Sequence, residues 1–152
     1  MTMAAPPFTS AQIREACPAG HALDIVTTRG GEVVDRRRTV YFDPQASAVS
    51  ISVTALDADG EPVGEAMEAR STWDELRDHA VFPGEVTTVT RETIETPLGR
   101  LECARYDVAS GEVTLVFWFS SQFPGMPIRS ATMSDGHEVE TTMVTAVMDP
   151  SA

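Results

Sequence analysis

Residues 101–120 read LECARYDVASGEVTLVFWFS, and the alternation of apolar and polar side chains in this stretch predicts two antiparallel strands. The two runs, 100–108 and 113–121, are separated by Ser110 and Gly111, which favour a tight turn. Because successive side chains of a strand point to opposite faces, Phe117 and Phe119 share one face of the second strand and Trp118 lies on the other. Both faces carry large apolar groups, which indicates a central strand of a sheet.

The same period of two continues on both sides of this hairpin. Pairs of residues that favour turns separate the alternating runs, for example Gly30-Gly31, Pro124-Gly125 and Asp135-Gly136. We expect a mainly β (α+β) fold, a single strongly curved antiparallel sheet or open half-barrel, with a two-sheet sandwich as the alternative. The expected strands, about nine in all, are 21–28, 32–42, 46–55, 62–70, 86–95, 100–108, 113–121, 128–133 and 139–148.

Two short helices interrupt the strands. Thr9 or Ser10 can cap a helix that runs through Ala16, and Thr72 stands three residues before Glu75 in the pattern of a capping box for a helix over 71–80. Trp73, Leu76 and Ala80 recur at helical spacing in the second segment, so this apolar stripe must pack against another element. We expect residues 1–7 to be a flexible N-terminus and residues 8–149 to form one domain.

Composition and charge exclude several classes of function. The chain has 152 residues, is 42% hydrophobic and carries a formal charge of −12. A surface that follows phosphates needs clustered basic residues, so we expect no nucleic-acid partner and no docking on an anionic membrane. No signal-peptide pattern and no apolar run of membrane-spanning length is present, and we therefore expect a cytoplasmic protein without membrane insertion.

The usual signatures of catalysis and metal binding are absent from the sequence. It contains no phosphate-binding glycine loop, no GxSxG elbow and no HExxH motif. His21, His79 and His137 lie far apart, and Cys17 and Cys103 are too few and wrongly spaced for a zinc site. We expect no metal and no cofactor, with Cys103 an inert core thiol; a Cys17–Cys103 disulfide is left open.

Aromatic and polar groups within the apolar strands are the better candidates for a ligand site. Tyr106 and the aromatic residues of 117–119 would supply its walls together with Trp73 of the second helix, and Arg105 or Arg129 would orient a polar head group. Met133 is an adaptable apolar side chain on a following strand. We expect the hollow face of the sheet to be the one that carries Trp118. The predicted ligand-binding residues are Trp118, Tyr106, Arg105, Arg129, Trp73, Phe117, Phe119 and Met133.

The segment TPLGRLECARYDVASGEVTLVFWFSSQFPGMPIR (96–129) resembles the bacterial LolA-like, lipoprotein-carrier half-barrel proteins. The resemblance implies a curved antiparallel sheet wrapped partly around helices, with an apolar concavity. Known members carry acylated proteins or lipids in the periplasm, and one cofactor-free relative rearranges a biosynthetic intermediate. The residues that match the pattern are Pro97, Gly99, Leu101, Cys103, Tyr106, Trp118, Phe119, Pro124, Gly125, Pro127 and Ile128.

Three hypotheses of function follow. The first is a small cytoplasmic, non-enzymatic binding protein that holds an apolar or amphipathic small molecule in the concavity. The second is a cofactor-free isomerase or cyclase of secondary metabolism, with Tyr106 as acid, Arg105 as orienting group and Glu102 as base. The third is an interaction or scaffold protein that uses an open sheet edge, for example to form a homodimer.

Overall fold

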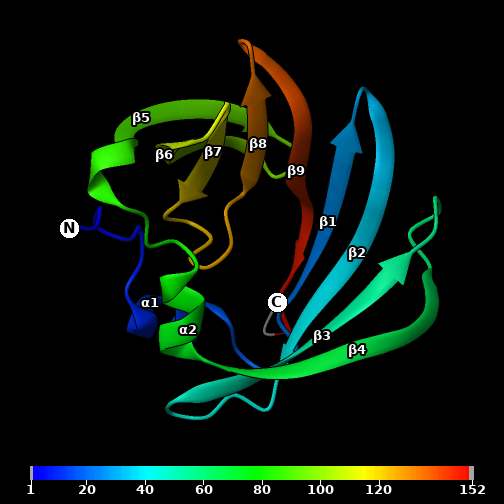
Figure 1. Ribbon diagram of the computed structural model, residues 1–152. Helices are drawn as coiled ribbons and strands as arrows, with labels where there is room; N and C mark the ends of the chain where they lie inside the picture. The colour runs from blue at the N-terminus through cyan, green and yellow to red at the C-terminus, as the bar shows by residue number, and fades with distance from the viewer. Residues whose placement is uncertain (1, 151–152) are drawn as a thin grey trace.

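All the strands belong to one open antiparallel sheet (Figure 1). The computed structural model describes residues 2–150. The sheet has nine strands in the order β4-β3-β2-β1-β9-β8-β7-β6-β5, so β4 and β5 are its two edges. The single mainly β sheet expected from the sequence is confirmed, and the sandwich is not formed. The strands are β1 Ala22–Arg29, β2 Glu32–Phe42, β3 Ala48–Leu56, β4 Pro62–Thr72, β5 Thr87–Thr96, β6 Gly99–Ser110, β7 Val113–Ser120, β8 Arg129–Ser134 and β9 His137–Met148.

The pairing of β1 with β9 brings the first and the last strand together in the middle of the sheet. One wing, β1 to β4, is therefore built from the first half of the chain, and the other, β5 to β9, from the second half. The turns expected between strands are present, and Asp135 and Gly136 both adopt the left-handed backbone that a two-residue hairpin requires, with φ of 52° and 79°.

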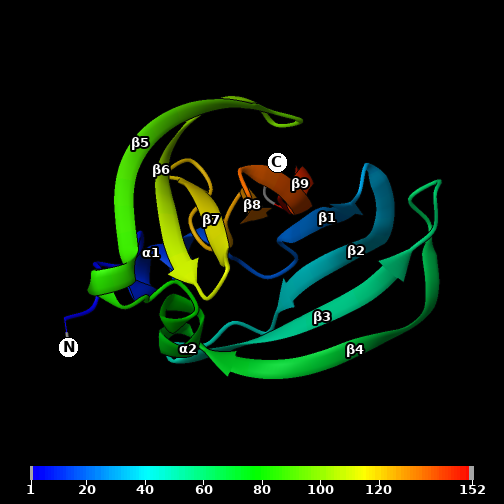
Figure 2. The same cartoon turned by 45° about the horizontal axis from the view of Figure 1, so that its top comes forward.

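Two short helices, α1 Ser10–Ala16 and α2 Trp73–Asp78, lie side by side on one face of the sheet. Each begins with a capping box: Thr9 pairs with Gln12, and Thr72 with Glu75. Ser10 Oγ donates a hydrogen bond of 2.5 Å to Asp74 Oδ1 and joins the two helix starts. Figure 2 shows α2 in the opening between the β5–β6 edge and the β3–β4 edge. A 3-10 turn, η1 Gly84–Val86, then leads into β5.

Apolar side chains are buried on both faces of the sheet, in two separate clusters. The first lies under the helices and contains Phe8, Ile13, Cys17, Leu23, Ile25, Tyr41, Val49, Trp73, Tyr106, Phe119 and Val144. The second lies on the opposite face of β6 to β8 and contains Leu101, Cys103, Val116, Trp118, Ile128 and Ala131. The two clusters explain why β7 has large apolar groups at consecutive positions.

The N-terminal segment, expected to be flexible over residues 1–7, forms hydrogen bonds with the rest of the chain where the structure describes it. Gly84 N donates to Thr2 O at 2.7 Å, Ala4 N donates to Phe82 O at 2.8 Å, and Tyr106 Oη donates to Ala5 O at 2.6 Å. A Cβ atom at Gly84 would lie 2.9 Å from Thr2 O, so this close approach requires glycine. Met1 lies outside the described residues.

Both cysteines are buried and free. Cys17 belongs to the cluster under the helices and Cys103 to the cluster on the other face, so no disulfide joins them. Burial raises the pKa of the Cys17 thiol to about 12, with a smaller contribution from the charge of Asp149. Burial likewise raises the pKa of Cys103. Because the thiolate is the nucleophile, both are unreactive core thiols in the folded protein.

Candidate functional site

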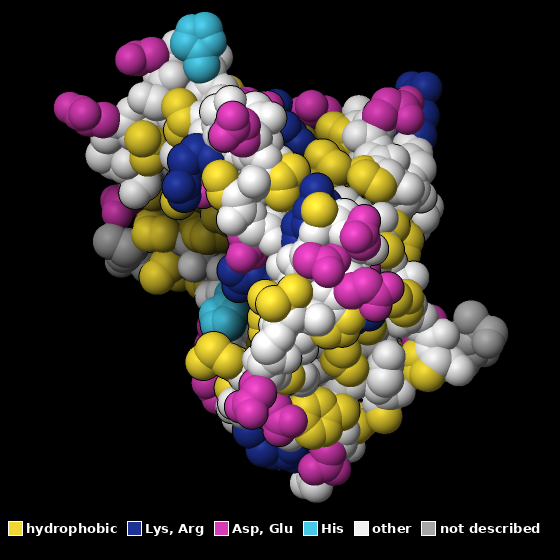
Figure 3. Space-filling view, turned by 90° about the vertical axis from the view of Figure 1, so that its right-hand side faces the viewer, with side chains coloured by type: hydrophobic (Ala, Val, Ile, Leu, Met, Phe, Trp, Pro, Cys, Tyr) yellow, Lys and Arg dark blue, Asp and Glu magenta, His cyan; other side chains and the backbone are white. Residues whose placement is uncertain are grey.

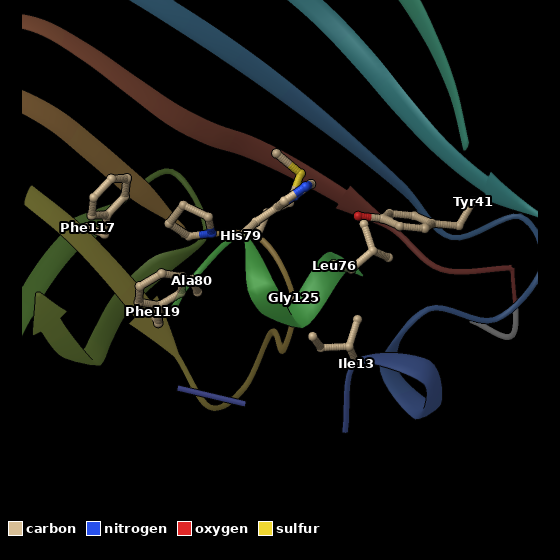
Figure 4. A pocket seen from close by; sticks show the side chains of 10 residues that line it. Ile13, Tyr41, Leu76, His79, Ala80, Phe117, Phe119 and Gly125 are labelled. Atoms are coloured by element: carbon tan, nitrogen blue, oxygen red, sulfur yellow. The ribbon is translucent and has the colours of Figure 1, made fainter. Parts of the chain in front are cut away.

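An apolar pocket of about 250 Å³ lies between the helices and the sheet (Figure 4). Its walls come from α1, α2, β2, β7 and the loop that follows β7. Carbon-rich side chains dominate, and two residues, Tyr41 and His79, bring polar groups. Pockets that bind small molecules have this character, mostly apolar with few polar groups. The lining residues are Ile13, Tyr41, Leu76, His79, Ala80, Phe117, Phe119, Gly125, Met126 and Pro127.

The start of α2 positions one wall of this pocket. Thr72 accepts a hydrogen bond of 3.0 Å from Glu75 N, and Glu75 Oε1 accepts one of 3.2 Å from Thr72 N. Trp73 is buried and donates from Nε1 to Gln45 O at 2.8 Å, which ties the first turn to the β2–β3 connection. With its start fixed in this way, the helix turns Leu76 and the following Ala80 toward the sheet.

The opposite wall consists of stacked aromatic rings on β7. Phe117 and Phe119 stack with 6.3 Å between ring centroids, and Phe82, which follows α2, stacks on Phe117 at 5.0 Å. Phe8 and Tyr106 meet Phe119 edge-on at 6.1 and 5.4 Å. These rings fix one another in the T-shaped and offset arrangements that aromatic pairs prefer, so this wall is preformed.

A separate, smaller recess lies on the same face of the sheet, and Phe117 lines it as well. This recess of about 60 Å³ is bordered by hydroxyls and a carboxylate: Ser130, Thr132, Thr142 and Glu140. Figure 3, which views the molecule from the side of the β2–β4 wing, shows a hollow with hydrophobic side chains at its bottom, while acidic side chains are scattered over the surrounding surface.

The predicted ligand-binding residues are divided between the two faces of the sheet. Phe117 and Phe119 line the apolar pocket. Tyr106 lies on the same face, but its ring is buried among aromatic neighbours and its hydroxyl bonds to the N-terminal segment. Trp73 is buried in the core under the helices and does not line the pocket.

Trp118, Arg105, Arg129 and Met133 lie on the other face, in an open groove of about 400 Å³. Arg105 and Arg129 stand directly opposite Trp118 on the neighbouring strands. Their guanidinium carbons lie 5.3 and 4.6 Å from the centre of the indole ring, within cation–π range. We expected the hollow face of the sheet to be the one that carries Trp118; this open groove lies there, whereas the apolar pocket under the helices lies on the Phe117 face.

Both arginines of this groove are already paired with carboxylates. Arg105 donates to Asp107 at 2.8 and 3.0 Å and to Glu92 at 2.7 Å, and these hydrogen bonds raise the pKa of Arg105. Arg129 donates to both carboxylate oxygens of Glu138 at 2.7 Å. A ligand head group would have to displace these partners, so the arrangement stabilises the Trp118 face more readily than it binds an anion.

The residues suggested for an isomerase or cyclase do not converge. Arg105 lies on the Trp118 face, while Tyr106 is its neighbour on the opposite face. Glu102 is exposed and lies 3.4 Å from Arg91, so it is a surface ion pair. Within residues 2–150, no group of three or more His, Cys, Asp or Glu side chains is placed to hold a metal ion.

Sequence reasoning missed most of the pocket, namely Ile13, Tyr41, Leu76, His79, Ala80 and Met126. A signal was present for two of them, because the stripe of Trp73, Leu76 and Ala80 had to cover some part of the sheet. The sequence contained no such signal for Tyr41, because nothing in the alternating pattern of β2 distinguishes it from the other residues of the strand.

Comparison with known proteins supports the fold alone. No family model matches this chain, and no curated protein is similar enough in sequence to count as a relative. MucB, in the crystal structure of its complex with MucA(peri), superposes with a TM-score of 0.57 over 90% of this chain and 53% of MucB, at 13% identity. The chain thus spans about half the length of MucB. PNGF-II superposes with a TM-score of 0.48 over 84% of this chain and 27% of its own, at 8% identity.

The likeness to MucB supports a LolA-like half-barrel fold for this chain. It agrees with the resemblance that residues 96–129 carry in the sequence.

No helix within residues 2–150 is long and apolar enough to cross a membrane.

Proposed function

We propose that the protein is a binding module that holds an apolar or amphipathic small molecule in the pocket between α2 and β7. The observation that carries this proposal is the pocket itself, about 250 Å³ of space whose walls are almost entirely apolar. An open pocket with such walls leaves apolar side chains in contact with water, which is unfavourable. A ligand that fills it would cover these side chains.

The two walls of the pocket differ in how firmly they are packed: the β7 wall is fixed, and the α2 wall is less extensively packed. The β7 wall is part of a stacked aromatic cluster, whereas α2 is only six residues long and is held by its cap, by the buried Trp73 and by α1. A helix of this length has no stability of its own, so small movements of α2 are the natural route for entry and release.

The proposal is tested by filling the pocket from α2. Ala80→Phe adds a ring where the ligand would lie, while Ala109→Phe adds the same ring at an exposed position of β6. N-phenyl-1-naphthylamine, an uncharged dye that fluoresces in apolar surroundings, is the probe. We expect saturable binding to the wild type and to Ala109→Phe, with at least a tenfold loss in Ala80→Phe. Equal binding by all three folded proteins would contradict the proposal.

A protein partner at the sheet edge is the second candidate. Strand β4 pairs only with β3, and its Met67 and Val63 are 79% and 51% exposed. Unpaired strand edges with apolar side chains are templates for strand addition. The neighbour MucB was solved in complex with MucA(peri), which makes a protein partner reasonable for this fold. Light scattering across a range of concentrations tests the homodimer: a monomer at all concentrations would reject it, and a dimer abolished by Met67→Lys would support it.

A further inference from the structure

The hydroxyl of Tyr41 points into the apolar pocket (Figure 4). Tyr41 is only 3% exposed, and its ring is fixed in the core under the helices. Within residues 2–150 its Oη takes part in none of the side-chain hydrogen bonds, and burial, together with the charge of Cys17, raises its pKa. The phenol therefore stays protonated, and it presents an unused donor to a space with apolar walls.

Such a donor is costly when it has no partner. The pocket is open to solvent, so water can satisfy the Tyr41 Oη donor when no ligand is bound. A ligand that displaces this water must supply an acceptor, because otherwise the hydroxyl loses its hydration without a replacement. The Tyr41 hydroxyl therefore favours a ligand with a group that accepts a hydrogen bond from it.

His79 supplies the second polar group of this pocket. It lies at the end of α2, and Figure 4 shows its imidazole reaching toward the side of the pocket where the Tyr41 hydroxyl lies. The remaining lining residues are hydrophobic apart from Gly125, and no arginine is among them. A carboxylate buried here would find no arginine beside it, only the imidazole of His79, and the protein as a whole carries a formal charge of −12.

We propose that the ligand of this pocket is a compact apolar molecule with one uncharged carbonyl group, whose oxygen accepts a hydrogen bond from Tyr41 Oη. This inference rests on the proposed binding function and names the class of molecule that it serves: a ketone, aldehyde, ester or amide on an apolar body. His79 lies where it can contact the same polar group. Phe117, Phe119 and Leu76 surround the apolar part.

The test compares a ketone and an acid of equal chain length on two proteins. Binding of 2-octanone and of octanoate is measured by displacement of N-phenyl-1-naphthylamine from the wild type and from Tyr41→Phe, which removes only the hydroxyl. We expect 2-octanone to bind the wild type more tightly than octanoate does. Tyr41→Phe should weaken 2-octanone roughly three- to tenfold, the range of one hydrogen bond, relative to its effect on the dye.

Infrared spectroscopy adds a direct readout of the hydrogen bond. The stretch of the labelled ¹³C=O group of bound 2-octanone should lie at lower frequency in the wild type than in Tyr41→Phe. If the dye binds but the ketone has equal affinity and equal frequency in both proteins, the carbonyl inference is wrong and the binding function stands. Tighter binding of octanoate would also overturn it in favour of an acid. If neither the dye nor the ketone binds the wild type, both proposals fail.

Discussion

At the scale of single residues, consecutive positions of β7 serve different parts of the molecule. Phe117 and Phe119 form a wall of the pocket, whereas Trp118 packs between two ion-paired arginines on the opposite face. Alternation predicted that these residues divide in this way. It could not predict which face the helices cover, because both faces of β7 are apolar and the choice depends on where α1 and α2 dock.

Gly84 tests how firmly the N-terminal segment is attached. Gly84→Ala would place a methyl group 2.9 Å from Thr2 O, so we expect a loss of about 1–2 kcal/mol in the free energy of unfolding, measured by urea denaturation. In a chain shortened to begin at Pro6, the same substitution should cost nearly nothing, because its neighbour is gone. Equal costs in the full and shortened chains would show that Thr2 does not approach Gly84.

Cys17 links stability to pH at the alkaline end. Its pKa is 9.0 without burial and about 12 in the folded protein. The folded state therefore holds the thiol proton more tightly, and this contribution is complete below pH 9 and is lost as the pH rises toward 12. Between pH 8 and 10.5 we expect the wild type to lose about 1–2 kcal/mol more than Cys17→Ser, which cannot ionise there. Parallel pH profiles in urea denaturation would contradict this.

At the scale of elements, local chemistry predicted most of the strands and both helix starts. Gly30-Gly31 and Asp135-Gly136 mark hairpins because they adopt left-handed backbone, and β2 spans the predicted 32–42. The predicted N-cap at Thr9 and the predicted capping box at Thr72 are also present. The attached N-terminal segment was missed, because its hydrogen bonds join residues about 80 to 100 positions apart and leave no local pattern.

The start of α2 is expected to matter for both stability and binding. Thr72→Ala removes the hydroxyl that accepts from Glu75 N, and we expect a loss of about 1 kcal/mol in the free energy of unfolding. Because α2 forms one wall of the pocket, binding of N-phenyl-1-naphthylamine should weaken as well. Thr72→Ser keeps the cap and should retain stability and binding. Equal losses in the two variants would assign the effect to the methyl group of Thr72.

At the scale of the whole molecule, the sequence predicted an open curved sheet, and the structure adds the arrangement that makes a site. Pairing of β1 with β9 places the two halves of the chain side by side, and α2 lies in the opening between the edges (Figure 2). Tyr41 and Phe117 belong to different halves and meet only across this opening. They come close because the sheet is curved. The alternation of apolar and polar residues in the sequence does not predict this curvature.

The most direct test of the account is methyl NMR of the methionines during titration with N-phenyl-1-naphthylamine. Met126 lines the apolar pocket, Met133 lies in the groove beside Trp118, and Met67 is exposed on the β4 edge. Each of the three candidate surfaces thus has its own methyl group. We predict saturable shifts of Met126, with Met133 and Met67 unchanged. Shifts at Met133 or Met67 with an unperturbed Met126 would contradict the proposed pocket.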